Sequence, residues 1–451
     1  MLITDVPPTR KRRRDQSIML TSPLLAPTTD SRAERLLRLL RGAFFLGGFS
    51  GTSYERFVTL FFVRRGLSAE QIGILEAIKP VIQALGTQQL SILADTTHKR
   101  KLVSLSAQAM SCSLLMLLLI PELGCYGCWL TIGLVVCAVA AFCQPATSVL
   151  DAYTLDTLDE VGRPRDYGKY RLALAISWGV GASVQGLVAD GISIDACFPI
   201  YAVFTLLQLG LLSYILPGQT RSEATLAAAE HQSAPSVWLF WRATCTPRNA
   251  FFICEIALFG CGIAFVEKFL FVYATEELRA SARLCGYSVG MTVILELPLF
   301  YWAEPLLRWC GYDLLMVLSL VAYTMRVYCF TLLTPQTVWL LLPIELLHGV
   351  SFGLAWTVAI DFWRAVTPTE WLMTSMWLLN IAKECVGTGT GALLGGWAMQ
   401  HASFMGIPGG RGLYLFASLG GATLAMTHAA LAIGLRCSRS GHRGLLYVCT
   451  T

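Results

Sequence analysis

The feature that most constrains this chain is a succession of long apolar blocks. A helix advances about 1.5 Å per residue, so roughly 20 mostly apolar residues cross the hydrocarbon core of a bilayer. Of the 451 residues, 55% are hydrophobic and only 14% are charged, which is typical of polytopic membrane proteins. We therefore predict an all-α membrane protein with twelve transmembrane helices, at about 42–63, 70–94, 101–121, 129–150, 170–190, 197–216, 250–275, 284–306, 312–333, 337–362, 370–398 and 411–435.

A long polar stretch divides these blocks into two sets of six. Six helices, a linker and six more helices is the plan of two-lobed secondary transporters, whose substrate site lies between the lobes near the bilayer midplane. A channel or a membrane enzyme could share this layout. The predicted parts are a disordered basic cytoplasmic tail (1–41), an N-terminal six-helix lobe (42–216), a cytoplasmic linker (217–249), a C-terminal six-helix lobe (250–435) and a cytoplasmic tail (436–451).

Basic residues gather on alternate connections, including "HKRK" at 98–101 and the tail after the last block. Cytoplasmic loops carry an excess of Lys and Arg, so we predict that both termini are cytoplasmic. The formal charge of +5 is matched by the basic run 10–14 alone. Topology therefore explains the charge better than nucleic-acid binding does.

Cysteine usage and known catalytic motifs favour neither a metal site nor an enzyme. The 15 cysteines lie mostly within apolar blocks, where a thiol behaves as a small apolar side chain. Cys125 and Cys128 in "CYGC" lack a nearby histidine or second cysteine pair, so we expect two incidental thiols and no metal or cofactor. The sequence has no GxxxxGK[ST] loop and no HExxH motif, which argues against ATP hydrolysis and against a zinc-dependent enzyme.

Several stretches, met in order, resemble the major facilitator superfamily. "SILADTTHKRKLV" (91–103) resembles its signature of Gly-x-x-x-Asp followed by basic residues. Asp95 and Arg100 match the acidic and basic members of this gating loop, and Ser91 replaces the glycine. "VLDAYTLDTLDEVGRPRDYGKYRLALAISWGVGA" (149–182), "IELLHGVSFGL" and "LLNIAKECVG" narrow the resemblance to the proton-coupled oligosaccharide symporters typified by lactose permease and their eukaryotic relatives.

The resemblance implies a substrate site at Asp151, Arg171 and Trp178. Arg171 and Trp178 are seven residues apart, so they project from one helix face about 10 Å apart along the axis. An arginine fork against a carboxylate makes a bidentate clamp, and an indole offers a flat face to a sugar ring. The alternative is a structural pair of Asp151 and Arg171 at the cytoplasmic rim, with Trp178 as an interfacial anchor.

The resemblance also implies proton coupling at Glu296, Arg326, Glu345 and His348. Glu345 and His348 are three residues apart and share a helix face. A histidine and a buried carboxylate can exchange protons near neutral pH, which makes a relay plausible. The bacterial pattern has a proton-carrying carboxylate where this chain has Ser351, so Glu345 or Glu296 would have to carry the proton. The alternative is a neutralised network that only holds two helices together.

Other charges within the apolar blocks must be paired, because an unpaired charge at a helix centre costs roughly 2.5–3.5 kcal/mol. By resemblance Lys383 pairs with an acid on the seventh helix, where Glu267 is the candidate, although Lys268 is an alternative partner for Glu267. Glu76 and Lys79 are three residues apart and are expected to neutralise each other.

The function we expect is secondary active transport of a small polar solute, by resemblance a sugar, driven by protons. The expected partners are this solute, protons and the lipid bilayer, with the chain acting as a monomer. The alternative is a transporter-like receptor or scaffold that binds a ligand or a partner protein without turnover. Flux in liposomes would separate the two, because a receptor binds without flux.

Overall fold

The computed structural model describes residues 31–97, 99–123, 125–143, 145–163, 166–218, 245–367 and 371–438. These are mostly helical, with one short antiparallel hairpin of β1 (Ser403–Phe404) and β2 (Ile407–Pro408). The helices of the first half are α1 (Ser31–Glu55), α2 (Val58–Arg64), α3 (Ala69–Thr97), α4 (Arg100–Met116), α5 (Trp129–Phe142), α6 (Pro145–Glu160), α7 (Tyr167–Gly191) and α8 (Cys197–Ile215). Those of the second half are α11 (Pro247–Glu276), α12 (Ala282–Tyr301), α13 (Ala303–Thr331), α14 (Leu341–Val366), α15 (Leu372–Asn380), a π-helical stretch (Ile381–Thr388), α16 (Gly389–His401) and α17 (Gly409–Ser438).

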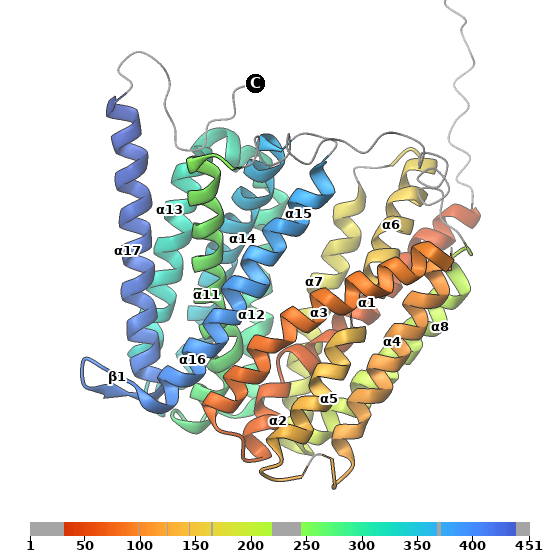
Figure 1. The fold of residues 1–451 in the computed structure, drawn as a ribbon, viewed down its shortest axis with the longest axis horizontal. Coiled ribbons are helices and arrows are strands. Elements are labelled where there is room, and N and C mark those ends of the chain that lie inside the picture. The colour runs from red at the N-terminus through yellow and green to blue at the C-terminus, as the bar shows by residue number, and fades with distance from the viewer. Residues whose placement is uncertain are drawn as a thin grey trace, which may run out of the picture.

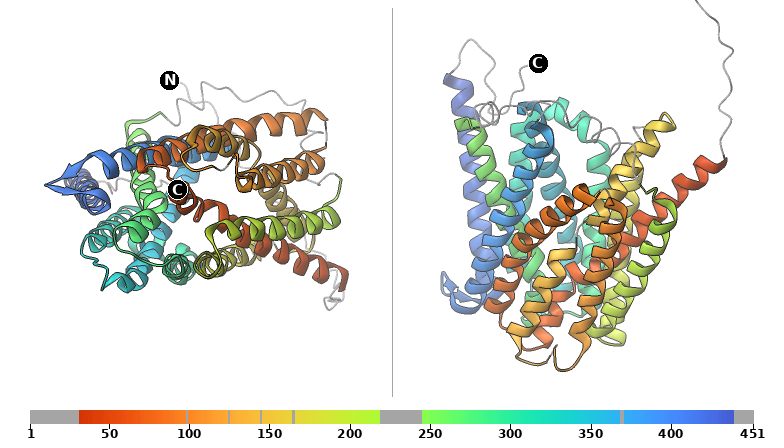
Figure 2. Two further views of the ribbon diagram at one scale, coloured as in Figure 1. Left: turned by 90° about the horizontal axis from the view of Figure 1, so that it is seen from below. Right: turned by 45° about the vertical axis from the view of Figure 1, so that its right-hand side comes forward.

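The two halves form two lobes that lie side by side, α1–α8 on the right of Figure 1 and α11–α17 on the left. The same division is visible from below in the left panel of Figure 2. We call the side where α8 ends and α11 begins the linker side, and the opposite side, which carries β1 and β2, the hairpin side. The predicted all-α polytopic fold is confirmed in this arrangement.

Eight helices among the described residues are long and apolar enough to cross a membrane by themselves. The remaining predicted segments are also helical, but they are polar or interrupted. The first is divided between α1 and α2, and the eleventh between α15, the π-helical stretch and α16. The interruptions of the first and eleventh segments both line the cavity between the lobes.

The predicted span 129–150 is wrong as a single helix. α5 ends at Phe142 and a new helix, α6, begins at Pro145. Proline favours the first position of a helix, and it pushes the residue before it out of the helical region. The break places Asp151 in the second turn of α6 rather than at the end of a continuous span.

The first helix begins earlier than predicted, at Ser31 within the segment 1–41 assigned to a disordered tail. Leu37 and Leu40 are buried and pack in one apolar cluster with Leu212 and Ile215 of α8. This burial stabilises an additional three turns of helix. Residues 1–30, 219–244 and 439–451, which hold the rest of the predicted tails and linker, lie outside the described residues.

The prediction of two incidental thiols in "CYGC" is also wrong, because Cys125 and Cys128 form a disulfide. The turn around Gly127 (φ 77°) brings the two residues to a Cα–Cα distance of 5.4 Å. The disulfide lies in the connection between α4 and α5, on the hairpin side. Disulfides persist in oxidising compartments, and such compartments lie on the non-cytoplasmic side of a membrane.

The lobes are in close contact toward the hairpin side, along α3 with α16 and along α7 with α12. A Cβ on Gly73 would lie 2.5 Å from the carbonyl oxygen of Ala392, and one on Gly286 would lie 2.4 Å from that of Ala182. Glycine is therefore required at both positions for the backbones to approach. At this end the carboxylate of Glu70 lies 2.9 Å from Nε2 of His401, and the backbone N–H of Glu70 donates to Oε1 of Gln400 at 3.1 Å, both across the lobe boundary.

Candidate functional site

A cavity of about 1010 Å³ lies between the lobes and extends toward the linker side. It is lined by α1, α3, α4, α6, α7 and α8 of one lobe and by α11, α14, α15 and the π-helical stretch of the other. Its volume is at the upper end of the range of about 300–1,000 Å³ for small-molecule sites. The helix contacts described above lie toward the hairpin side, whereas the cavity lining includes Gln88 and Ser91 near the linker-side end of α3.

Irregular helix segments position the polar side chains of this cavity. α1 ends at Glu55, and the chain turns at Arg56 before α2 begins. α3 contains Pro80, and the π-helical stretch carries Lys383 and Glu384. Interrupted helices and π-helical turns recur at functional sites because they release backbone groups and redirect side chains.

The uncharged part of the lining combines hydrogen-bonding groups with flat aromatic rings. Its amides are Gln83, Gln88, Gln108, Gln208 and Asn380, and its aromatic side chains are Phe44, Tyr54, Trp178, Tyr201, Phe352 and Trp377. Amides both donate and accept hydrogen bonds, as hydroxyl-rich solutes require. Aromatic faces pack against the C–H side of such solutes.

The charged part of the lining is balanced, with three acids and three bases. These are Glu55, Arg56, Glu267, Lys268, Lys383 and Glu384. Lys383 contacts Glu384, and its Nζ also lies 5.5 Å from the ring centre of Phe352 and 5.3 Å from that of Trp356. The cavity therefore offers no surplus of positive or negative charge to a solute.

Two neighbouring residues of each lobe form ion pairs across the boundary. Arg56 Nη2 lies 3.1 Å from Glu267 Oε1, and Lys268 Nζ lies 2.9 Å from Glu76 Oε2 and 3.9 Å from Glu55 Oε2. The expected pair of Glu76 and Lys79 is confirmed, at 3.0 Å. We call Glu55, Arg56, Glu76, Lys79, Glu267 and Lys268 the inter-lobe charge cluster. All of its members except Glu76 and Lys79 line the cavity.

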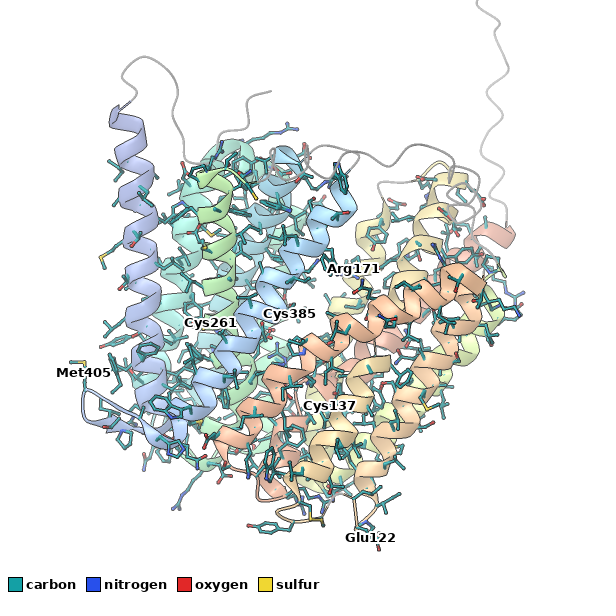
Figure 3. The ribbon with its side chains drawn as sticks, viewed as in Figure 1. Glu122, Cys137, Arg171, Cys261, Cys385 and Met405 are labelled. Atoms are coloured by element: carbon teal, nitrogen blue, oxygen red, sulfur yellow. A yellow bond between two sulfur atoms is a disulfide. The ribbon has the colours of Figure 1, made fainter. Side chains whose placement is uncertain are left out.

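The predicted substrate trio is only partly brought to the cavity. Trp178 lines it and lies against Gly51, where a Cβ would be 2.9 Å from the indole Cζ3. Asp151 and Arg171 pair at 3.4 Å, and Tyr167 donates to Asp151 at 2.7 Å, but neither Asp151 nor Arg171 lines the cavity. Arg171 is half exposed and lies nearer the linker side than Cys137, as Figure 3 shows.

The predicted proton-coupling residues Arg326, Glu345 and His348 do form one network. Arg326 of α13 donates from Nε and Nη2 to the two oxygens of Glu345, at 3.2 and 2.7 Å, and its Nη1 lies 2.9 Å from His348 Nδ1. All three side chains are buried, and the network lies within the C-terminal lobe. A bidentate bond of this kind balances the negative charge of the Glu345 carboxylate within the lobe.

The chemistry of arginine also determines the state of His348. A guanidinium has only donors and stays charged, so Nδ1 of His348 must accept and the ring must be neutral, with its proton on Nε2. The ring stacks on Phe352 at 5.4 Å between centres, and Phe352 lines the cavity. In this conformation the network matches the structural alternative, and a relay would require Arg326 to move.

Glu296 and Ser351 lie beside this network but outside its hydrogen bonds to Arg326. The backbone of Glu296 on α12 lies against Gly349, and among the described residues its carboxyl has no hydrogen bond or ion pair. Ser351 donates to the carbonyl oxygen of His348 at 3.2 Å. Serine therefore serves as a backbone partner here, where the bacterial pattern has a carboxylate.

The predicted pair of Glu267 and Lys383 is not formed in this conformation. Glu267 pairs with Arg56 of the other lobe, and Lys383 pairs with Glu384. The alternative partner, Lys268, turns to Glu76 instead. Sequence reasoning did not find Arg56 and Glu76 as partners, because both come from the opposite lobe.

The predicted gating loop is described only in part. Arg100 is the first residue of α4, at the linker side. The side chain of Asp95 lies outside the described residues, as does residue 98 between them.

Sequence reasoning missed one buried acidic–histidine cluster in the C-terminal lobe. His428 of α17 contacts Glu255 of α11 at 2.6 Å and lies 3.7 Å from Asp313 of α13, with all three side chains nearly inaccessible. An acid in "FFICEIALFG" and a histidine in the last apolar block were the signals that could have indicated it. The cluster joins three helices and lies away from the cavity.

The sequence pattern of the MFS_1 like family matches residues 40–406. Over 305 residues the chain is 24% identical to the probable 3-phenylpropionic acid transporter of Escherichia coli (strain K12), covering 68% of this chain and 76% of that protein. Over 355 residues it is 26% identical to sugar efflux transporter A of Dickeya chrysanthemi, covering 75% and 84% respectively.

Solved structures show the same fold. The nucleoside transporter NupG, in a mutant form, superposes with a TM-score of 0.74 and 16% identity, covering 88% of this chain and 99% of that one. A second NupG structure gives a TM-score of 0.71 over 88% and 98% of the two chains. At this identity the likeness concerns the fold alone.

Proposed function

This chain belongs to the MFS_1 like family, within the major facilitator superfamily, and from that membership we propose that it is a proton-driven transporter. Its proposed solute is small, neutral and rich in hydroxyl groups, and a sugar is the simplest solute of this kind. That it is a multi-pass secondary transporter and not an enzyme follows from the family. The solute and the driving ion are the proposal.

The observation that carries the choice of solute is the balanced cavity. Three acids and three bases line it, and each base has an acidic partner. An anionic solute would have to displace one of these acids from its basic partner. The free-energy cost of that displacement is higher than the cost of binding a hydroxyl group, which can join the existing hydrogen bonds. The amides and aromatic rings of the lining suit a sugar in the same way.

The proposed orientation has both termini and the linker in the cytoplasm, with the hairpin side facing outward. Two independent features support it. The basic residues Lys99, Arg100 and Lys101 lie on the linker side, and the Cys125–Cys128 disulfide lies on the hairpin side. The conformation then has its cavity open to the cytoplasm.

The test is a solute screen with the purified protein in liposomes, with and without an imposed pH gradient. The panel comprises neutral mono- and disaccharides, nucleosides and aromatic carboxylic acids. The proposal predicts saturable uptake of a neutral sugar that an inward proton gradient accelerates. Uptake of the acids alone, or uptake that ignores the gradient, would contradict it; binding without flux would favour the receptor alternative.

A further inference from the structure

We propose that Glu267, bonded to Arg56 across the lobe boundary, is the carboxylate whose protonation couples the proton gradient to lobe movement. This inference rests on the proposed proton-driven function and assigns its coupling group. A proton from cavity water adds to the carboxylate of Glu267, the ion pair with Arg56 loses its charge attraction, and the hairpin side becomes free to open.

Position and partner both distinguish Glu267 from the other acids. Its side chain is 29% exposed and lines the cavity, so water reaches it. Its bonded partner, Arg56 in the turn between α1 and α2, belongs to the other lobe, so separation of the lobes removes that partner. The charge of Glu267 and the position of the lobes are therefore linked, and by reciprocity each changes the equilibrium of the other.

The remaining acids of the cluster do not meet both conditions. Glu76 is fully buried and keeps Lys79, three residues away on its own helix, when Lys268 withdraws. Glu55 lies 3.9 Å from Lys79 of its own lobe and therefore also keeps a cation nearby.

The Arg326–Glu345 pair is a poorer coupling group for a different reason. Both side chains are only 3% exposed, and α13 and α14 belong to one lobe. A rocking movement of the lobes carries both partners together, so the distance between Arg326 and Glu345, and with it the charge of Glu345, does not depend on the lobe positions.

The charged and titratable groups that act on Glu267 come from its own helix and from both lobes. Besides Arg56 they are Lys268 on its own helix, Lys383 in the π-helical stretch and His348 on α14. Glu296 on α12 adds a second carboxyl to the same region. After lobe separation Lys268 and Lys383 are the cations of the same lobe near Glu267, and neither is bonded to it in this conformation.

The experiment measures lobe positions without any solute. Pairs of spin labels are attached to cysteines introduced at Val161 and Trp309 on the linker side, and at Ile192 and Met405 on the hairpin side, all of which are exposed. The other free cysteines are replaced by alanine, and distances between labels are measured in lipid nanodiscs from about pH 8 to about pH 5. Arg56→Gln and Glu267→Gln are compared with the unsubstituted labelled protein.

The expected result is that acidic pH lengthens the Ile192–Met405 distance and shortens the Val161–Trp309 distance. A charge-assisted hydrogen bond of this kind changes the ratio of the two conformations by about tenfold. Glu267→Gln should show the acidic distribution at every pH. Arg56→Gln should resemble it, and the double variant should add nothing further, because both changes remove one bond.

A control variant and a set of contradicting outcomes test the inference. Glu304→Gln removes a carboxylate that pairs with Arg308 within α13, on the surface, and should keep the pH response. Retention of the response in Glu267→Gln, its loss in Glu345→Gln alone, or its absence from the unsubstituted protein would overturn the inference. Failure of the solute screen with an intact Glu267-dependent response would count against the proposed transport only.

Discussion

Lys268 of the C-terminal lobe reaches into the N-terminal lobe and bonds the carboxylate of Glu76 at 2.9 Å. Glu76 has no exposed surface and receives a second cation, Lys79, from its own helix at 3.0 Å. Lys79 in turn lies 4.5 Å above the ring of Tyr54. One acid thus has a permanent partner in its lobe and a second partner that depends on the position of the other lobe.

The first prediction follows from this double pairing. Lys268→Met should lower the thermal unfolding midpoint in detergent only modestly, because Lys79 still neutralises Glu76. Lys79→Met with Lys268→Met should cost about 3–5 kcal/mol, the cost of an unpaired buried charge. Midpoints measured for both single variants and the double variant would decide. An additive double variant would mean that the two lysines do not share Glu76.

The second prediction concerns Arg326 and Glu345. Arg326→Met leaves a buried carboxylate without its bidentate partner and should destabilise the protein by about 3–5 kcal/mol. Adding Glu345→Met should recover most of that loss, because both charges are then absent. Thermal unfolding of the two variants checks this. If the double variant is as unstable as the single one, the pair is not a neutralising unit.

The third prediction separates the members of the proposed substrate site. Trp178→Ala should raise the KM for the sugar identified in the screen by about tenfold, because it removes an aromatic face worth roughly 1 kcal/mol or more. Trp178→Phe should retain most of the affinity.

Arg171→Ala is the comparison for Trp178, since Arg171 pairs with Asp151 outside the cavity. It should change KM by less than about twofold, as is usual for exposed ion pairs. A large rise in KM for Arg171→Ala would revive the clamp of Asp151 and Arg171 inferred from the resemblance.

The fourth prediction uses the glycine contact between α7 and α12. Gly286→Val places a side chain 2.4 Å from the carbonyl oxygen of Ala182, so the hairpin side must separate. The Ile192–Met405 label distance should lengthen at every pH. Gly210→Val on α8 is the matched control, because nothing lies within 4 Å of its Cβ position; an equal change there would indicate a general disturbance.

The fifth prediction tests orientation through the disulfide. Cys125 and Cys128 should react with a maleimide only after reduction, and a membrane-impermeant reductant added outside intact cells or sealed right-side-out vesicles should suffice. Labelling that requires permeabilisation would place this loop on the cytoplasmic side and reverse the proposed orientation. Cys125→Ser with Cys128→Ser is the control for the reacting residues.

The sequence by itself indicated most of the helices and the superfamily. Blocks of about twenty apolar residues have few options other than membrane-spanning helices, because the bilayer core leaves no water to satisfy an open backbone. Local spacing was equally informative for Glu76 with Lys79, and for Glu345 with His348, since residues three apart share a helix face. Arg326 joined the second pair on the adjacent antiparallel helix, as the resemblance implied.

Only the tertiary structure decided which charges meet across the lobes. Glu267 was expected beside Lys383, and Lys268 beside Glu267, but their partners proved to be Arg56 and Glu76, some 200 residues earlier in the chain. For the same reason the sequence did not indicate that His428 lies beside Glu255, or that Asp151 and Arg171 lie outside the cavity lining. A helix pattern specifies which face a residue occupies, whereas the partner of that face depends on how two lobes pack, and that packing is a property of the whole chain.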